Sequence, residues 1–133
     1  MRNKDILSYA QEILRRADAE SPRVDLMKIA RWAGVKVLAH SCTNNSLSDN
    51  ELGKLLSDGE HWYIVYRDTC EPETKRFTVA HELGHLFLKH AEEKYKLATK
   101  HEKQADMFAS CLLYHTTNST HGGINYVNEN TRK

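Results

Sequence analysis

The sequence predicts an α+β fold with a pair of N-terminal helices, a small and mostly antiparallel sheet, and two further helices. Three observations support this prediction. Apolar residues recur at three- and four-residue steps near both ends of the chain, as on one face of a helix. The middle of the chain instead contains short alternating or β-branched and aromatic stretches. Turn-forming residues separate these segments, so the helices and strands are expected to be short and distinct.

The N-terminal third is predicted to contain two helices and one strand. Apolar side chains repeat with helical spacing over residues 3–18, and Ser21-Pro22 interrupts the pattern. A shorter helix is expected over residues 24–33, with Gly34 as its C-terminal stop. The alternation in residues 35–39 then predicts a strand.

The middle of the chain is predicted to complete the sheet. Residues 41–50 are polar and rich in turn formers, which indicates a loop. Residues 51–57 are compatible with either a second strand or an irregular connection, and residues 57–60 with a turn. The clearest strand signal is His61–Arg67, which is β-branched and aromatic. This strand could offer an edge for an added peptide strand, or it could simply be a core strand.

The C-terminal half is predicted to contain two longer helices. Pro72 fits the first turn of a helix that continues to about residue 92. A lysine-rich connection follows, and a last helix is expected over residues 100–115. Residues 116–133 are polar and are expected to form a tail. The prediction is therefore a single domain over residues 1–115 followed by that tail.

Composition excludes several classes of function. The 133 residues include 19 basic and 18 acidic side chains, whereas nucleic-acid-binding domains are usually strongly basic. No stretch approaches the roughly 20 apolar residues that span a bilayer, and the polar N-terminus does not resemble a signal peptide. The three cysteines lack the spacing of a zinc motif, and free thiols fit a cytoplasmic protein.

The most informative motif is His81-Glu82-Leu83-Gly84-His85 within the third predicted helix. Residues four apart on a helix lie on one face, so both imidazoles can bind one metal ion. Glu82 is offset from the two histidines and can reach a water bound to that ion, as in metalloproteases with this motif. Gly84 is unfavourable within a helix by about 1 kcal/mol, which predicts that another element packs closely there.

A catalytic zinc site requires three protein ligands and one open position. The next predicted helix offers His101, Glu102 and Asp106 as candidates for the third ligand. We expect Glu102 to bind the metal. Asp106 would then accept a hydrogen bond from the far ring nitrogen of one ligand histidine, which fixes the tautomer and the ring direction.

At this point the sequence resembles a known family. The stretches Arg76–His85 (RFTVAHELGH) and Glu102–Ala109 (EKQADMFA), with the segment from Asp25 to Val37, are similar to the ImmA/IrrE family of metallopeptidases. The resemblance covers about residues 5–115. It departs from the family pattern after Leu112-Leu113, where Tyr114-His115 replaces the usual Met-Pro.

This resemblance implies a zincin-like fold of the gluzincin type with one zinc ion per chain. The zinc ligands would be His81, His85 and Glu102, and Glu82 would be the catalytic glutamate. Members of the family are soluble bacterial, phage and mobile-element proteins. Several of them cleave helix-turn-helix repressors at one site, so a repressor of this kind is the expected partner.

The residues therefore predict a zinc endopeptidase in which Glu82 takes a proton from water and passes it to the leaving amine. A donor for the oxyanion is also required, and Tyr114, His115 and His121 are equivalent candidates. Two alternatives remain. The protein could be a metal-containing binding module that recognises a regulator without cutting it, or the metal could be purely structural. The retained Glu82 favours the enzyme, because a binding module needs no general base.

Overall fold

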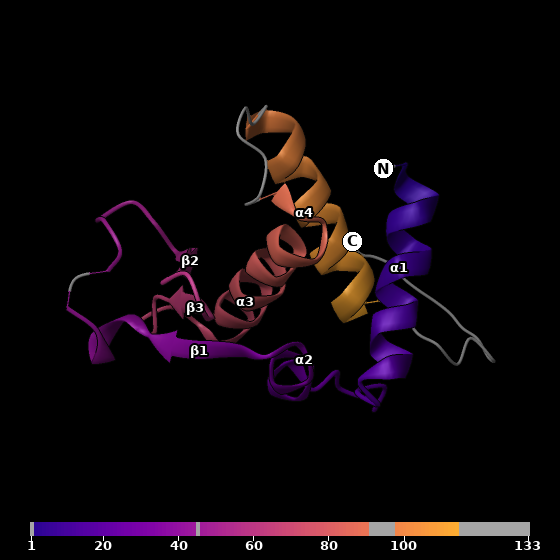
Figure 1. The fold of residues 1–133 in the computed structure, drawn as a ribbon, viewed down its shortest axis with the longest axis horizontal. Coiled ribbons are helices and arrows are strands. Elements are labelled where there is room, and N and C mark those ends of the chain that lie inside the picture. The colour runs from indigo at the N-terminus through magenta and orange to yellow at the C-terminus, as the bar shows by residue number, and fades with distance from the viewer. Residues whose placement is uncertain (1, 45, 91–97, 115–133) are drawn as a thin grey trace.

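The computed structural model describes residues 2–44, 46–90 and 98–114 and has an α+β architecture. Within these residues four α-helices lie to one side of a three-stranded sheet (Figure 1). The elements follow the predicted order. Their bounds are α1 Asn3–Arg16, α2 Leu26–Ala33, β1 Val35–Ala39, the 3-10 helix η1 His40–Cys42, β2 Gly53–Ser57, β3 Trp62–Tyr66, α3 Pro72–Phe87 and α4 Ala98–Tyr114.

The two N-terminal helices form where the sequence predicts them. One face of α1 is almost completely buried, through Ile6, Ala10, Ile13 and Leu14. Asp25 caps the start of helix α2, because its side chain accepts a hydrogen bond from the backbone N–H of Lys28. Gly34, which follows the last helical residue, caps the other end in a left-handed conformation at φ 78°. Both ends of α2 are therefore fixed by local sequence.

The sheet is mixed, which corrects the expectation of a mostly antiparallel sheet. The strand order is β1-β3-β2, with β1 parallel and β2 antiparallel to β3. A short turn joins β2 to β3 and so makes them antiparallel, whereas β1 reaches β3 only by a pairing distant in the sequence. Residues 51–57, ambiguous in sequence, contain the edge strand β2. The strand over residues 61–67 is central and paired on both sides, so it cannot offer the free edge suggested above.

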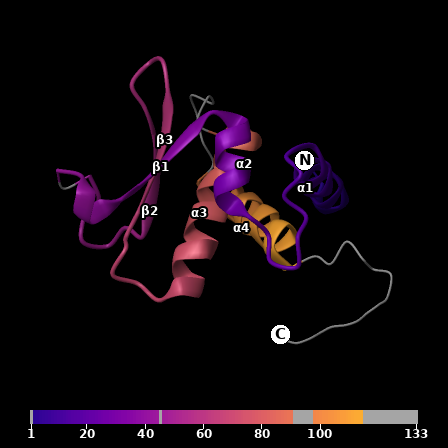
Figure 2. The same cartoon turned by 90° about the horizontal axis from the view of Figure 1, so that it is seen from below.

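The elements are arranged in layers around α3. Seen from below, the sheet, α3, α4 and α1 follow one another across the molecule (Figure 2). Helix α3 packs against β2 and β3 on one side and against α4 on the other, and α1 packs against α4. Gly53 of β2 allows α3 to approach the sheet, because a Cβ atom there would lie 2.4 Å from Cγ2 of Thr78.

An aromatic cluster joins three of the helices. Phe87 at the end of α3 and Phe108 in α4 stack with ring centroids 5.8 Å apart. Tyr9 of α1 meets both rings edge to face, and its hydroxyl donates a hydrogen bond to the carbonyl oxygen of Phe87 at 3.3 Å. Phe108 is completely buried. These contacts fix α4 relative to α3, which matters because both helices carry the histidine and carboxylate side chains of interest.

Two predicted boundaries change in the C-terminal half. Helix α3 ends at Phe87 rather than near residue 92, because Lys89 adopts a left-handed conformation at φ 63°. Helix α4 begins two residues earlier than predicted. Most of the predicted lysine-rich connection and the whole predicted tail at 116–133 lie outside the described residues, which omit 91–97 and 115–133. Within the described part of the chain, no helix is both long enough and apolar enough to cross a membrane.

Candidate metal centre

His81 and His85 lie one turn apart on α3 and direct their rings toward the same point. The two Nε2 atoms are 3.1 Å apart. The ring centroids are separated by 4.7 Å and the ring planes are nearly perpendicular. Both side chains are mostly buried, with 15% and 14% of their surface exposed. The helical spacing noted in the sequence thus places both nitrogens at one site.

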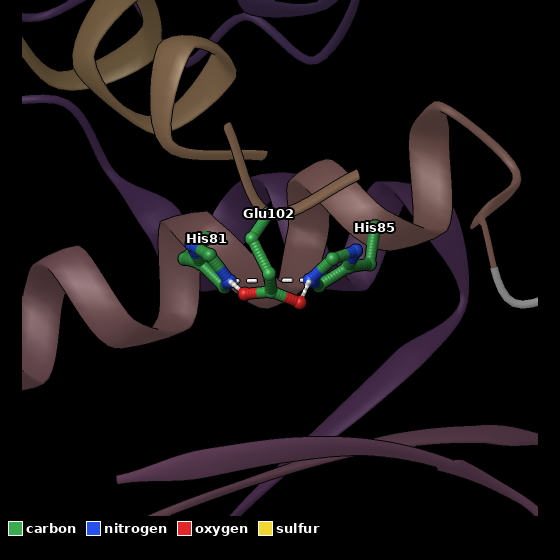
Figure 3. Close-up of side chains that lie close together, drawn as sticks. All are labelled: His81, His85 and Glu102. Atoms are coloured by element: carbon green, nitrogen blue, oxygen red, sulfur yellow. Dashed lines mark hydrogen bonds and ion pairs between the residues drawn. The ribbon is translucent and has the colours of Figure 1, made fainter. Parts of the chain in front are cut away.

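Glu102 of α4 brings its carboxylate between the two rings (Figure 3). Its Oε1 atom is 2.9 Å from Nε2 of His81, and its Oε2 atom is 3.0 Å from Nε2 of His85. These three residues form a group that could hold a metal ion, with ligand atoms within 4.8 Å of one another. A tetrahedral zinc ion with bonds of about 2.0–2.1 Å needs ligand atoms about 3.3 Å apart, so the observed separations fit such an ion.

A close crossing of α3 and α4 makes this meeting possible. A Cβ atom on Gly84 would lie 3.2 Å from both Cα and the carbonyl oxygen of Ala105, and 3.3 Å from Cβ of Phe108. Two of these three atoms belong to the backbone of α4, which a side chain at position 84 would push away. The prediction that another element packs tightly against Gly84 is therefore confirmed. The crossing holds α4 near enough for Glu102 to reach both histidines.

Asp106, one turn beyond Glu102 on α4, contacts the far side of the His81 ring. Its Oδ1 atom lies 2.7 Å from Nδ1 of His81. If Nδ1 of His81 carries the proton and donates it to this carboxylate, Nε2 keeps a lone pair directed at the site. The hydrogen bond expected for Asp106 is thus formed in the structure, and it is made to His81 rather than to His85.

Glu82 lies on the side of α3 that faces the sheet. Its Cγ atom would be 3.5 Å from a Cβ atom placed on Gly53 of β2. Only 9% of the residue is exposed. Burial raises the pKa of its carboxyl group to about 7, since the charged form loses hydration, and the nearby His81 only partly opposes this effect. A carboxyl group of this kind can both accept and return a proton near neutral pH.

Burial has the opposite effect on His85. It lowers the pKa of the imidazole to about 4, although the Glu102 carboxylate acts to raise it. The neutral ring therefore predominates at physiological pH. Neutral imidazole is also the form that binds metal ions, because the protonated ring has no free lone pair.

The other histidine considered as a ligand is not part of this group. His101 is 93% buried and stacks on His90, with ring centroids 4.1 Å apart and planes 9° from parallel. Tyr114 is an exposed residue at the end of α4, and His115 and His121 lie outside the described residues. The sequence analysis did not identify His90, which contacts His85. Five-residue spacing in a continuous helix would have placed the two rings on different sides.

Comparison with protein families matches the chain to the family described as IrrE N-terminal-like domain, Peptidase_M78. The match covers residues 30–118, about two thirds of the chain. The chain belongs to this family. The matched region contains His81, Glu82, His85 and Glu102, so the candidate metal centre lies within the part that defines an ImmA/IrrE relative. A metallopeptidase-type family implies a bound metal, in agreement with the geometry. Comparison with curated proteins finds no match.

Proposed function

We propose that this protein is a zinc-dependent endopeptidase. The observation that carries the proposal is the convergence of His81, His85 and Glu102, with the buried Glu82 adjacent to His81 on the same helix. Two imidazoles and one carboxylate are a common ligand set of catalytic zinc sites in peptidases, where a fourth position stays open. A closed structural site would need a fourth protein ligand. Among the described residues, this cluster brings three possible ligands together.

The proposed mechanism assigns each residue one task. His81, His85 and Glu102 would hold the ion, which when bound lowers the pKa of a water ligand toward 7 and polarises the scissile carbonyl. Glu82 would take the proton from the attacking water. It would then transfer this proton to the amine of the departing peptide. The elevated pKa of Glu82 supports this role, since a general base acts best when its pKa lies near the working pH.

The substrate we propose is a protein segment bound in extended form. Strand β2 is at the edge of the sheet and runs beside Glu82, so its free edge is placed to pair with a peptide backbone. By analogy with the family, the partner would be a helix-turn-helix repressor of a phage or mobile element, cleaved at one site in the cytoplasm. The balanced charge of the chain supports a protein partner rather than direct binding to nucleic acid.

The decisive test compares wild-type protein with Glu82→Gln during co-expression with a candidate repressor. Metal content is measured on the purified proteins, and cleavage is followed by mass spectrometry. We expect both proteins to contain about one zinc ion per chain and only the wild type to cut. Glutamine keeps the shape of the side chain but cannot accept the proton.

Two results would contradict the proposal. If both proteins bind the repressor equally and neither cuts it, the chain is a binding module. If the wild type contains no metal after purification and reloading, the metal centre itself is wrong. Glu60→Gln, an exposed carboxylate on the turn between β2 and β3, is the matched control and should cut like the wild type.

A further inference from the structure

His85 is hydrogen-bonded, behind the metal centre, to the buried His90, which in turn contacts the partly buried Gln104. Its Nδ1 atom lies 2.9 Å from Nδ1 of His90. The other nitrogen of His90, Nε2, lies 2.8 Å from the amide oxygen of Gln104 in α4. His90 itself is only 3% exposed. Three side chains thus form one continuous hydrogen-bonded chain that ends at the Nε2 atom of His85.

The acceptor at the end of this chain determines where each proton sits. An amide oxygen only accepts hydrogen bonds, so Nε2 of His90 must carry a proton and donate it to Gln104. In the neutral ring, Nδ1 of His90 is then an acceptor, and the proton between the two rings must come from Nδ1 of His85. The lone pair of His85 is consequently on Nε2. That atom faces Glu102 and His81.

The local backbone places His90 where this contact is possible. In a continuous helix, a residue five positions after His85 would point about 140° away from it. The left-handed conformation of Lys89, at φ 63°, ends the helical path and turns the next residue back toward His85. Stacking on His101 of α4, with planes 9° from parallel, then fixes the plane of the His90 ring. Helices α3 and α4 both contribute to holding His90.

We propose that His90 and Gln104 are positioning residues that hold His85 in the tautomer and direction needed to bind the metal. This inference rests on the proposed metal centre and assigns a supporting partner to the second histidine. The two ligand histidines then differ in the hydrogen-bond partner of their Nδ1 atoms. Asp106, a carboxylate with 58% of its side chain exposed, contacts His81, whereas the neutral pair of the buried His90 and the partly buried Gln104 supports His85.

The first experiment measures zinc affinity of the full-length protein by competition with a chromophoric chelator. We expect His90→Leu to weaken zinc binding by about 10–100-fold, the usual effect of losing such a partner. Gln104→Leu should weaken it in the same direction. If the two residues act in series, the double variant should bind no more weakly than His90→Leu alone. His90→Gln should restore part of the affinity, because its amide can accept from His85 and donate to Gln104.

His61→Leu is the matched control, since it removes an exposed histidine outside the metal-binding group and should leave zinc affinity unchanged. Two outcomes separate the two proposals. If the wild type binds zinc and His90→Leu binds it equally well, the positioning role is refuted while the metal centre stands. If the wild type binds no zinc, both are refuted.

A second measurement avoids variants and therefore any concern about their folding. In the zinc-loaded protein labelled with nitrogen-15 at histidine, we expect scalar coupling between the two Nδ1 atoms across the His85–His90 hydrogen bond. We also expect the proton of His90 to be on Nε2. A spectrum that places the His90 proton on Nδ1 would overturn the inference, because two N–H groups would then face each other.

Discussion

Replacement of Glu82 by glutamine is expected to stabilise the metal-free protein at alkaline pH and to have little effect at acidic pH. Burial raises the pKa of this carboxyl group from 4.5 to about 7 in the folded protein. The unfolded chain therefore loses this proton at lower pH than the folded chain, and the wild type loses stability as the pH rises between these values. At about 1.4 kcal/mol for each pH unit, the loss amounts to about 3 kcal/mol. Glutamine does not ionise, so the Glu82→Gln protein does not undergo this loss of stability.

The assay is urea unfolding of both proteins in the presence of a strong chelator at pH 5, 6, 7 and 8. The quantity of interest is the free energy of unfolding of Glu82→Gln minus that of the wild type. The lowered pKa of His85 also makes stability depend on pH, but it affects both proteins and largely cancels in this difference. We expect the difference to be under about 1 kcal/mol at pH 5 and to grow by about 2–3 kcal/mol by pH 8. A difference that stays constant, as expected for the exposed Glu60→Gln, would refute the reasoning.

Three further predictions follow from the packing and hydrogen bonds of α3 and α4. Asp106→Ala should weaken zinc binding about 10–100-fold in a chelator competition, because His81 loses its acceptor; Asp106→Asn should have a smaller effect, since an amide oxygen can still accept. Gly53→Ala should lower the free energy of unfolding in urea by about 1–3 kcal/mol, because its Cβ would lie 2.4 Å from Cγ2 of Thr78. Adding Thr78→Ser removes that methyl group and should recover most of the loss; no recovery would assign the strain to the backbone of β3. Phe108→Ala should cost about 3–5 kcal/mol in the same assay, because the ring is completely buried, and a loss below 1 kcal/mol would show that the surrounding helices collapse into the space.

The elements that sequence predicts well are those fixed by local interactions. Asp25 and Gly34 delimit α2 through a side-chain cap and a left-handed glycine, both readable from residue type. The strand pairing is different, because the parallel contact between β1 and β3 joins segments more than twenty residues apart. The end of α3 also could not be predicted from the sequence, because the left-handed position is occupied by Lys89 rather than by glycine. A lysine there gives no signal that the helix stops.

The same distinction applies to the candidate metal centre. The convergence of His81 and His85 follows from helical spacing alone. The approach of Glu102 depends on how two helices cross, and Gly84 was the only residue type that hinted at a close crossing. The contact between His90 and His85 requires the unpredicted turn at Lys89, so no pattern in the sequence could reveal it. The roles of these residues in metal binding and catalysis stay predictions until the variants are measured.

The position of α1 has a practical consequence for work on relatives of this protein. The family match begins at residue 30, after α1 and in the middle of α2. Yet Ile6, Ile13 and Leu14 are at most 2% exposed, and α1 covers the side of α4 that points away from the histidines. A fragment trimmed to the matched region would lack α1, so Phe108 would lose its contact with Tyr9 and become exposed on that side. Helix α4, which carries Glu102, would then be held less firmly. A fragment designed for expression should therefore include α1, even though α1 lies outside the region of sequence similarity.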